Sequence, residues 1–330
     1  MLTLEKGDKI GIFSPSSPIT ATSPLRFARA KRFLESKGFQ IVEGCLTGKQ
    51  DFYRSGTILE RAEELNALIH DENIKMIMST IGGTNSNSLL PYIDYQAFKR
   101  NPKIMIGYSD TTAILLAIYA QTGCSVLYGP ALVSSFGEFP PFVDQTYKYF
   151  EQIAEKTNDY PLQLTSPDYW TDEAVNWEVK TKEKVKYRNR WIGINGAKAS
   201  GRLIGGNLNT MNGFWGSPYM PEVEKGDILL IEDSMKNASQ VEKNFSLLKV
   251  NGVFERIGGI LLGKHERFDD EGSGRSPMDL LLEVLNGKKL PIIADFDCCH
   301  THPMMTMPIG AEVTIDACER HPSVQINKRL

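Results

Sequence analysis

The chain of 330 residues has little cysteine, little histidine and almost no excess of charge of either sign. Its five cysteines are odd in number and scattered, and only Cys298 and Cys299 are adjacent, so a disulfide framework is excluded. The formal net charge of −3 provides no positive field for binding phosphate backbones. We therefore expect no nucleic acid polymer as a partner.

Long apolar segments are missing as well. The first residues, MLTLEKGDKIGIFSP, carry charges where a signal peptide needs an uninterrupted apolar stretch. No apolar run reaches the ~18 residues of a membrane span. We expect no membrane partner and a cytoplasmic location. The composition, 41% hydrophobic and 23% charged, is that of an ordinary folded protein, and its length suggests two domains.

The first half alternates short apolar runs with helical patterns. Helices are predicted from Ser23-Pro24 to about residue 38, from the capping box of Thr57 and Glu60 to about Asp71, and over residues 111–121. The second of these carries an apolar stripe at 58, 62, 65 and 69. The predicted strands are 9–13, 39–42, 74–78, 103–106 and 125–128. Continuous apolar strands are typical of parallel sheets covered on both faces. Residues 1–155 are therefore predicted to form a Rossmann- or flavodoxin-like α/β domain with a parallel sheet.

The pattern changes after residue 155. Residues 156–200 contain three tryptophans and a charge run at 180–190 with little periodicity, which indicates a connector and substrate loop. Beyond it, residues 201–330 are predicted to form a smaller C-terminal α/β domain. Its expected strands are 201–204, 227–231, 258–262, 291–296 and 311–315, and its expected helices are 240–250 and 277–285.

The segment at 103–112 holds a candidate nucleophile. An apolar strand runs into Gly107, Tyr108 and Ser109, and a helix begins at once. Such a sharp turn is typical of a nucleophile elbow, which exposes a serine hydroxyl beside a helix N-terminus. The residues after Ser109 do not complete the pattern G-x-S-x-G, and serine is also a favoured N-cap. On the residues alone, Ser109 is either a nucleophile or a helix cap.

A serine nucleophile needs a base, and His300 and His302 follow the apolar strand at 291–296. The same two histidines with Asp295 and Asp297 are also compatible with metal ligation, and histidines in a fold are often structural. These three interpretations stay open on the residues alone.

Two further loops follow predicted strands. Glu232 and Asp233 end the strand at 227–231, where an acid either orients a histidine or caps the next helix. Gly82 and Gly83 follow the strand at 74–78, and their amides can face a ligand. The pattern of a phosphate-binding loop is not present there.

Four segments together resemble the LD-carboxypeptidase group of serine peptidases, which includes the microcin C self-immunity proteins. They are TIGGTNSN at 80–87, GYSDTT at 107–112, LLIED at 229–233 and HTHPMMTMPIG at 300–310. The resemblance covers nearly the whole chain.

The resemblance implies a catalytic triad divided between two domains. Ser109 would be the nucleophile, Glu232 the orienting carboxylate and His300 the base. The amides of Gly83 and Asp110 would form the oxyanion hole, with no metal and no cofactor. Family members commonly pair as homodimers, so we expect a homodimer.

The substrate expectation comes from the loop at 81–85, where LD-carboxypeptidases typically carry RGGYG and this chain has IGGTN. The chain is thereby similar to the microcin immunity branch, whose members cleave the amide bond between an acidic aminoacyl group and a nucleotide-like toxin. Trp177 is the candidate for stacking on the base, with a buried core tryptophan as its alternative. Asn209 and Lys236 are candidates for holding polar groups of the ligand. The other functions considered are hydrolysis of peptidoglycan tetrapeptides and nonenzymatic binding of a nucleotide or peptide on the same fold.

Overall fold

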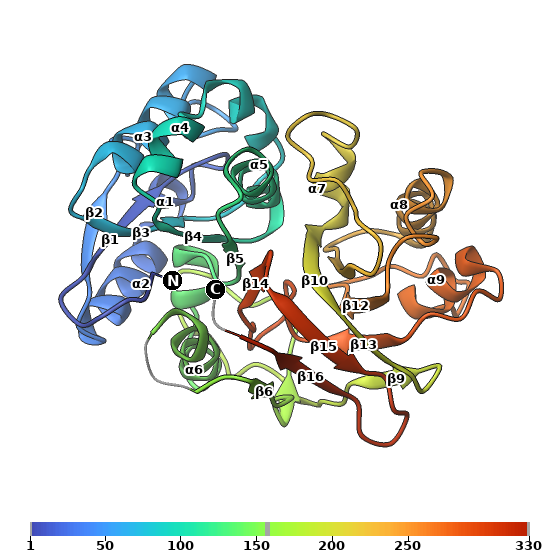
Figure 1. Cartoon of the computed structure of the whole chain (residues 1–330). Coiled ribbons are helices and arrows are strands. Elements are labelled where there is room, and N and C mark those ends of the chain that lie inside the picture. Colours follow the sequence, from blue (N-terminus) through green and yellow to red (C-terminus); the bar gives the residue numbers. More distant parts are fainter. Residues whose placement is uncertain (1, 156–158, 329–330) are drawn as a thin grey trace.

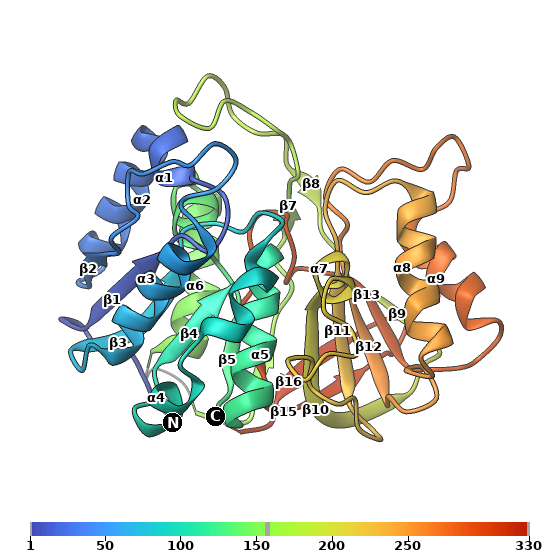
Figure 2. The same ribbon diagram turned by 90° about the horizontal axis from the view of Figure 1, so that it is seen from above.

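The structure is a computed structural model that describes residues 2–155 and 159–328. Two large sheets, each with its own helices, lie beside one another and share one continuous apolar core (Figure 1, Figure 2). Residues 156–158, where we place the start of the connector, lie outside the described residues. No helix in the described ranges is both long enough and apolar enough to cross a bilayer.

The first sheet has the strand order β14-β5-β4-β3-β1-β2. Its five N-terminal strands are parallel, and β14 is antiparallel at the edge beside β5. The strands are β1 (Lys9–Phe13), β2 (Gln40–Glu43), β3 (Ile74–Ser79), β4 (Ile104–Gly107), β5 (Val126–Tyr128) and β14 (Met307–Ile309). Each predicted strand of the first half is present, within one or two residues of its predicted bounds.

Helices cover both faces of this sheet, as the apolar strands predict (Figure 1). One face carries α2 (Pro24–Ser36), the π-helical η3 (Leu132–Phe136) and α6 (Phe142–Ala154). The other carries α3 (Ile58–His70), the 3-10 helix η1 (Ser86–Tyr92), α4 (Tyr95–Arg100) and α5 (Thr112–Thr122). The Thr57–Glu60 capping box of α3 is confirmed. Ser23 precedes α2 as expected, but its side chain makes no capping hydrogen bond, and a short helix, α1 (Ile19–Thr22), comes before it.

The second sheet has the order β6-β16-β15-β10-β11-β12-β13-β9, with a parallel centre from β10 to β13. Helices α8 (Ala238–Val250) and α9 (Pro277–Leu285) pack against each other on one face of it (Figure 2), and α7 (Leu208–Asn212) follows β10. The strands are β6 (Leu162–Leu164), β9 (Ile192–Ile194), β10 (Lys198–Asn207), β11 (Ile228–Glu232), β12 (Gly259–Gly263), β13 (Ile292–Phe296), β15 (Glu312–Asp316) and β16 (Ser323–Ile326).

The sheets do not follow the order of the chain strictly. Strands β6 and β9, from the connector, join the second sheet, and β14, from the last part of the chain, joins the first. Two more connector strands, β7 (Tyr169–Trp170) and β8 (Tyr187–Arg188), pair with each other. Strands of two or three residues are too short to show periodicity, so the sequence does not indicate them. Our domain boundaries at 155 and 200 stay predictions.

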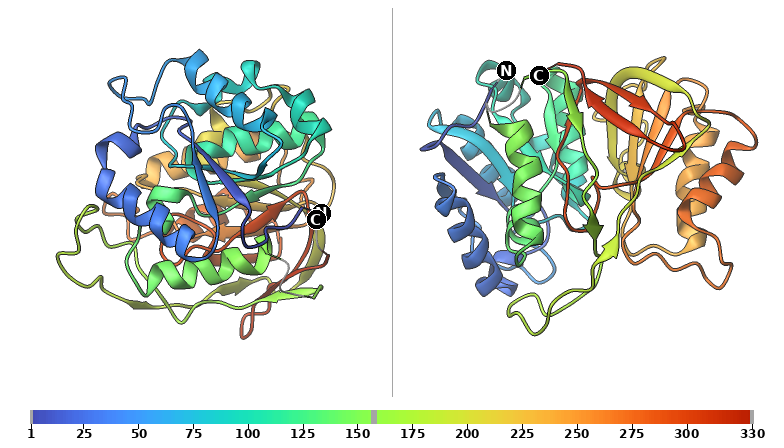
Figure 3. Two further views of the ribbon diagram at one scale, coloured as in Figure 1. Left: turned by 90° about the vertical axis from the view of Figure 1, so that its left-hand side faces the viewer. Right: turned by 90° about the horizontal axis from the view of Figure 1, so that it is seen from below.

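The connector loop between β7 and β8 reaches toward helices α1 and α2 (Figure 2, Figure 3). On the way it pairs with the segment after β13 through reciprocal backbone hydrogen bonds between Thr171 and His302, both of 2.9 Å. The connector is thereby joined to the segment that follows β13.

Candidate active site

Ser109 stands at the carboxyl end of β4 in an unusual backbone conformation. Its φ of 60° lies in the left-handed region, which a non-glycine residue rarely adopts and which is typical of strained functional turns. The 3-10 turn η2 (Ser109–Thr111) leads directly into α5. Tyr108 and Thr111 occupy the N-cap positions of η2 and α5, and neither side chain makes a capping bond. The interpretation of Ser109 as a plain helix cap is therefore wrong.

The double-glycine loop passes very close to this turn. A Cβ added to Gly82 would lie 2.9 Å from Ser109 Oγ and 2.9 Å from the backbone nitrogen of Asp110. The buried Asp110 carboxylate accepts hydrogen bonds of 2.9 Å from the amides of Asn85 and Ser86, and so ties the turn to the loop. Gly83 has a φ of 150° and room only for a hydrogen, because a Cβ there would lie 2.2 Å from Ser16 Oγ.

His300 lies against Glu232, which ends β11 and is 0% exposed. The distance from His300 Nδ1 to Glu232 Oε2 is 2.6 Å. Since a carboxylate only accepts, Nδ1 carries a proton in this pair and Nε2 is left to act as a base. Asn237 caps α8 together with Gln240, so the interpretation of Glu232 and Asp233 as caps of that helix is wrong.

The second oxygen of Glu232 connects this pair to the nucleophile's turn. Glu232 Oε1 accepts hydrogen bonds from the Tyr128 hydroxyl at 2.6 Å and from Asn207 Nδ2 at 3.0 Å. The same Tyr128 oxygen accepts the Ser109 backbone N–H at 3.3 Å. A chain of hydrogen bonds therefore runs from the backbone of Ser109 through Tyr128 and Glu232 to His300.

The pKa shifts fit a charged pair. Burial disfavours the His300 imidazolium, but the Glu232 carboxylate and its hydrogen bond outweigh burial and leave the pKa of His300 raised. Burial also acts to raise the pKa of Glu232, but His300, Tyr128 and Asn207 outweigh it and leave that pKa lowered. Glu232 is thus the anion of the pair at neutral pH.

His302 has a different environment. Its Nε2 lies 3.5 Å from Glu138, whose carboxylate also binds Arg26 at 3.1 Å and Lys184 at 2.7 Å. Burial lowers the pKa of His302 to about 3, so this histidine is neutral at ordinary pH. Its backbone pairing with Thr171 gives it a structural role in holding the connector.

The donor geometry does not fit the metal-ligation interpretation. His300 and His302 turn to different carboxylates, and Asp297 accepts hydrogen bonds from Lys264 at 2.6 Å and Trp191 at 2.7 Å. Throughout residues 2–155 and 159–328, no three His, Cys, Asp or Glu side chains gather as a metal site.

Ser109 and His300 line one cavity of about 410 Å³. Gly82, Gly83 and His302 line it as well, and the connector contributes Trp177. Trp177 is 38% exposed, so the interpretation of a buried core tryptophan is wrong. Neither Asn209, which is exposed on α7, nor Lys236, whose Nζ donates to the Ser234 carbonyl at 3.2 Å, is among the described residues that line this cavity. Their roles stay predictions.

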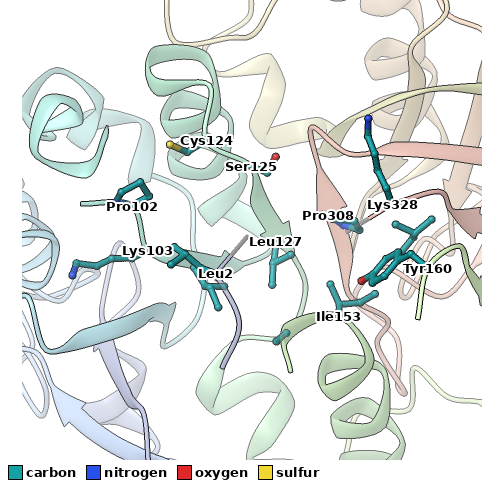
Figure 4. A pocket seen from close by; sticks show the side chains of 13 residues that line it. Leu2, Pro102, Lys103, Cys124, Ser125, Leu127, Ile153, Tyr160, Pro308 and Lys328 are labelled. Carbon is teal, nitrogen blue, oxygen red and sulfur yellow. The ribbon is translucent and has the colours of Figure 1, made fainter. Parts of the chain in front are cut away.

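A second cavity, of about 450 Å³, lies at the opposite end of the first sheet (Figure 4). It is formed where β4 and β5 begin, and its wall includes Lys103, Ser125, Leu127 and Tyr160. The Lys103 ammonium donates to the carbonyls of Asp71 and Ile74 at 2.7 and 2.9 Å. That ammonium is already bonded within the fold, and no histidine or carboxylate is among the described residues that line this cavity, so Ser125 has no such base beside it there.

Tyr128 and Asn207 were not among the predicted site residues. Each is the last residue of a strand, β5 and β10, and both contact Glu232. The sequence signal for them is their place at a carboxyl end of the sheet, where ligand sites of α/β folds form. The residue predicted in that segment is Asn209, as a contact of the ligand, and the prediction does not include Asn207.

Two family models match the chain in the same order as the two sheets. Residues 10–129 match the LD-carboxypeptidase N-terminal domain, and residues 200–315 match the LD-carboxypeptidase C-terminal domain.

Among curated proteins, the chain is 59% identical to a putative carboxypeptidase of Vibrio cholerae over 95% of this chain and 93% of that protein. It is 52% identical to the microcin C7 self-immunity protein MccF of Escherichia coli over 97% of this chain and 94% of that protein. A probable murein peptide carboxypeptidase of Bacillus subtilis is 27% identical over 96% of this chain and 91% of its own length.

Among solved structures, MccF in its wild-type apo state superposes with a TM-score of 0.97 at 52% identity, covering 99% of this chain and 98% of the other. Structures of that protein contain aspartyl sulfamoyl adenosine or glutamyl sulfamoyl guanosine. A tryptophan-to-phenylalanine mutant of it is in complex with adenosine monophosphate. One of its active-site mutants has a serine, an asparagine and a lysine replaced by alanine.

Proposed function

Because the chain belongs to the LD-carboxypeptidase family and is therefore a serine peptidase, we propose that Ser109, Glu232 and His300 are its catalytic triad and that it cleaves the amide bond of an aminoacyl nucleotide. The observation that carries the triad is the 2.6 Å contact of His300 with the buried Glu232, on a cavity that Ser109 shares. The likeness to MccF along the whole chain supports the substrate class.

The reaction follows from which proton each group can hold. His300 Nε2 takes the proton of Ser109 Oγ as the oxygen attacks the acyl carbon, and the buried Glu232 carboxylate stabilises the imidazolium that forms. The amides of Asp110 and Gly83 donate to the oxyanion of the tetrahedral intermediate. His300 then gives its proton to the leaving nitrogen, and a water activated by the same histidine releases the acyl group from Ser109.

Tyr128 and Asn207 act behind these groups. Their hydrogen bonds to Glu232 Oε1 leave Oε2 for His300, and the bond from the Ser109 amide to Tyr128 supports the strained turn. They are positioning residues, because each acts through Glu232 or through the backbone of Ser109.

The substrate assignment rests on Trp177, which is exposed at the wall of the cavity. An indole face stacks on any nucleobase, and the nucleoside ligands of MccF are of this kind. Asn209 and Lys236 remain our candidates for polar groups of the ligand, because the active-site mutant of MccF replaces residues of the same types. We also expect the enzyme to work as a homodimer in the cytoplasm.

The triad is tested by Ser109→Ala. The variant should keep its circular dichroism spectrum and lose turnover by several orders of magnitude, and it should no longer react with a fluorophosphonate probe. Ser125→Ala is the control, because it removes a serine hydroxyl from the other cavity; its hydrolysis and probe labelling should equal those of the wild type. Undiminished hydrolysis by Ser109→Ala would overturn the mechanism. Ligand binding by the wild type without probe labelling would favour a nonenzymatic binding protein.

The substrate class is tested by giving the enzyme aspartyl sulfamoyl adenosine and an L,D-tetrapeptide side by side. The murein peptide carboxypeptidase among the relatives makes the tetrapeptide the second candidate. We expect the nucleoside to be hydrolysed much faster. Preferential hydrolysis of the tetrapeptide would assign the enzyme to peptidoglycan metabolism instead.

A further inference from the structure

Trp177 lies in a part of the connector that has no helix or strand of its own. Residues 172–186 are irregular between β7 and β8, and most of their side chains are exposed. When a stacking residue lies on such a loop, the entropy lost in ordering the loop lowers the affinity for the ligand, unless other residues already hold the loop in place. The structure shows what holds it: the arginines of helix α2.

Arg29 binds the backbone of the loop. Its guanidinium donates to the carbonyl of Trp177 at 2.9 Å and to the carbonyl of Glu178 at 3.0 Å. A third hydrogen bond, to the carbonyl of Gly137 at 2.7 Å, and stacking on the Phe139 ring at 4.0 Å fix Arg29 itself. The planar guanidinium thus joins two carbonyls of the loop to the carbonyl of Gly137, which follows η3.

The N-terminus of α2 adds one more contact. The amide of Leu25, in the first turn of the helix, donates to the Glu178 carboxylate at 2.8 Å. The first amides of a helix have no partner within it, so Glu178 satisfies one of them from the loop. The negative charge of Glu178 suits this position, because a carboxylate is favoured at the positive N-terminal end of a helix.

Arg26 fixes the ring. Its guanidinium carbon lies 4.3 Å from the centroid of the Trp177 indole, a cation–π distance. Arg26 is 1% exposed and is held by the carbonyls of Val133 and Ser134 and by the Glu138 carboxylate, at 2.9, 2.7 and 3.1 Å. One face of the indole is therefore covered by a buried cation that has three hydrogen-bond partners of its own, and Trp177 is among the residues that line the cavity.

We propose that Arg26 and Arg29 are positioning residues for substrate binding, which hold Trp177 so that the uncovered face of its ring receives the nucleobase. This inference rests on the proposed function and deepens it. Arg29 sets the backbone of the loop and Arg26 sets the ring plane. Neither arginine needs to touch the substrate.

The test measures the affinity for adenosine monophosphate by calorimetry in a double-mutant cycle. Arg29→Ala should weaken binding about 5- to 10-fold, because the free energy needed to order the loop then reduces the binding free energy. Arg29→Lys should recover part of the loss. In the Trp177→Ala background, Arg29→Ala should cause no further loss. Arg32→Ala is the matched control, since Arg32 lies one turn further along α2 and its side chain makes no hydrogen bond among the described residues.

Kinetics separate positioning from general damage. With aspartyl sulfamoyl adenosine, Arg29→Ala should raise KM and leave kcat nearly unchanged. With an aspartyl anilide, which has a scissile amide and no base, both constants should match the wild type. Three results would overturn the inference. Arg29→Ala could weaken nucleotide binding as much in the Trp177→Ala background as in the wild type, it could leave the affinity unchanged, or Arg32→Ala could weaken binding as much as Arg29→Ala does. A wild type that does not bind the nucleotide, or a Trp177→Ala that binds it normally, would instead overturn the substrate assignment itself.

Discussion

Ser109 shows how a single dihedral angle decides between two interpretations of one residue. Serine before a helix is both a favoured cap and a possible nucleophile, and the residues around Ser109 are compatible with both. With its φ of 60°, Ser109 lies outside α5, and the N-cap position of that helix is occupied by Thr111. That angle is retained because Tyr128 and the loop at 81–85 surround the turn, and neither contact can be read from the local sequence.

The raised pKa of His300 predicts the pH dependence of the reaction. The base must be neutral to accept the serine proton, so kcat/KM should rise with pH through a pKa above the ordinary ~6.5. In Glu232→Gln the anion that raises this pKa is gone while burial remains. The acid limb of the profile should therefore move to lower pH, and the maximum rate should fall roughly 10³- to 10⁴-fold. The measurement is kcat/KM from pH 4 to 9.

Asp233→Asn is the control for this experiment. Asp233 is a buried neighbour of Glu232, but its carboxylate contacts Asn244 and the Ser234 amide at 3.0 Å each and not His300. Its loss should move the acid limb much less. An acid limb that stays in place or moves to higher pH in Glu232→Gln would contradict the assigned pairing.

The loop at 81–85 is expected to influence catalysis because its backbone passes close to Ser109. In Gly82→Ala the new methyl group would lie within 3 Å of both Ser109 Oγ and the Asp110 amide, where the acyl oxygen has to enter. We expect kcat/KM to fall by about 10²- to 10³-fold, the effect of losing an oxyanion donor. The backbone of Gly82 is not left-handed, so the cost of the substitution is steric. Because a Cβ there would lie 2.8 Å from Ser109 Cβ and 2.9 Å from the Asp110 nitrogen, the turn has to shift, and the melting temperature should fall while the circular dichroism spectrum stays that of a folded protein.

Gly213→Ala is the matched control, because a Cβ there has no neighbour closer than 3.3 Å. It should retain activity. Full activity in Gly82→Ala would show that the loop and Ser109 move apart on substrate binding, and the proposed oxyanion hole would then be wrong.

Elements differed in how well the sequence predicted them. Helix α3 carries its own start signal at Thr57 and a repeating apolar stripe, and its bounds were predicted within a residue. Strands β7 and β8 have two residues each, and β14 contains Pro308. Each of these strands forms through pairing with a strand that is not adjacent in the sequence, so local β-propensity does not predict it. The Arg29 contacts were missed for the same reason.

The molecule as a whole is predicted to unfold as one unit. Across the two sheets, Thr112 Oγ1 accepts the amide of Asn207 at 3.1 Å, and Thr146 Oγ1 accepts the amide of Met304 at 3.1 Å. Pairing of β14 with β5 adds backbone bonds to this boundary. Both halves therefore lose contacts when either one opens.

Thr57→Ala tests this coupling. Loss of the α3 cap should cost about 0.5–2 kcal/mol of unfolding free energy. Trp170, Trp191 and Trp215 lie outside the first five strands, so their fluorescence reports on the connector and the second sheet. Because Trp177 contacts Arg26 of α2, the comparison is made in a Trp177→Phe background. In urea, the fluorescence and circular dichroism midpoints should fall together. Glu63→Ala, on the exposed face of α3, should move neither.

A fluorescence midpoint that stays at the wild-type value while the circular dichroism midpoint falls would mean that the two halves unfold separately. The boundary contacts would then contribute little to stability, and the site between the halves would open before the sheets do.

The return of the chain to its first sheet sets the order of events during synthesis. Strand β14 covers the outer edge of β5, yet residues 307–309 leave the ribosome long after residues 126–128. Until then the strand that carries Tyr128 has an open edge, and neither His300 nor Glu232 has its full set of neighbours. The nascent chain therefore carries Ser109 in an unfinished sheet, and the proposed triad cannot act before the residues up to 309 have been synthesised.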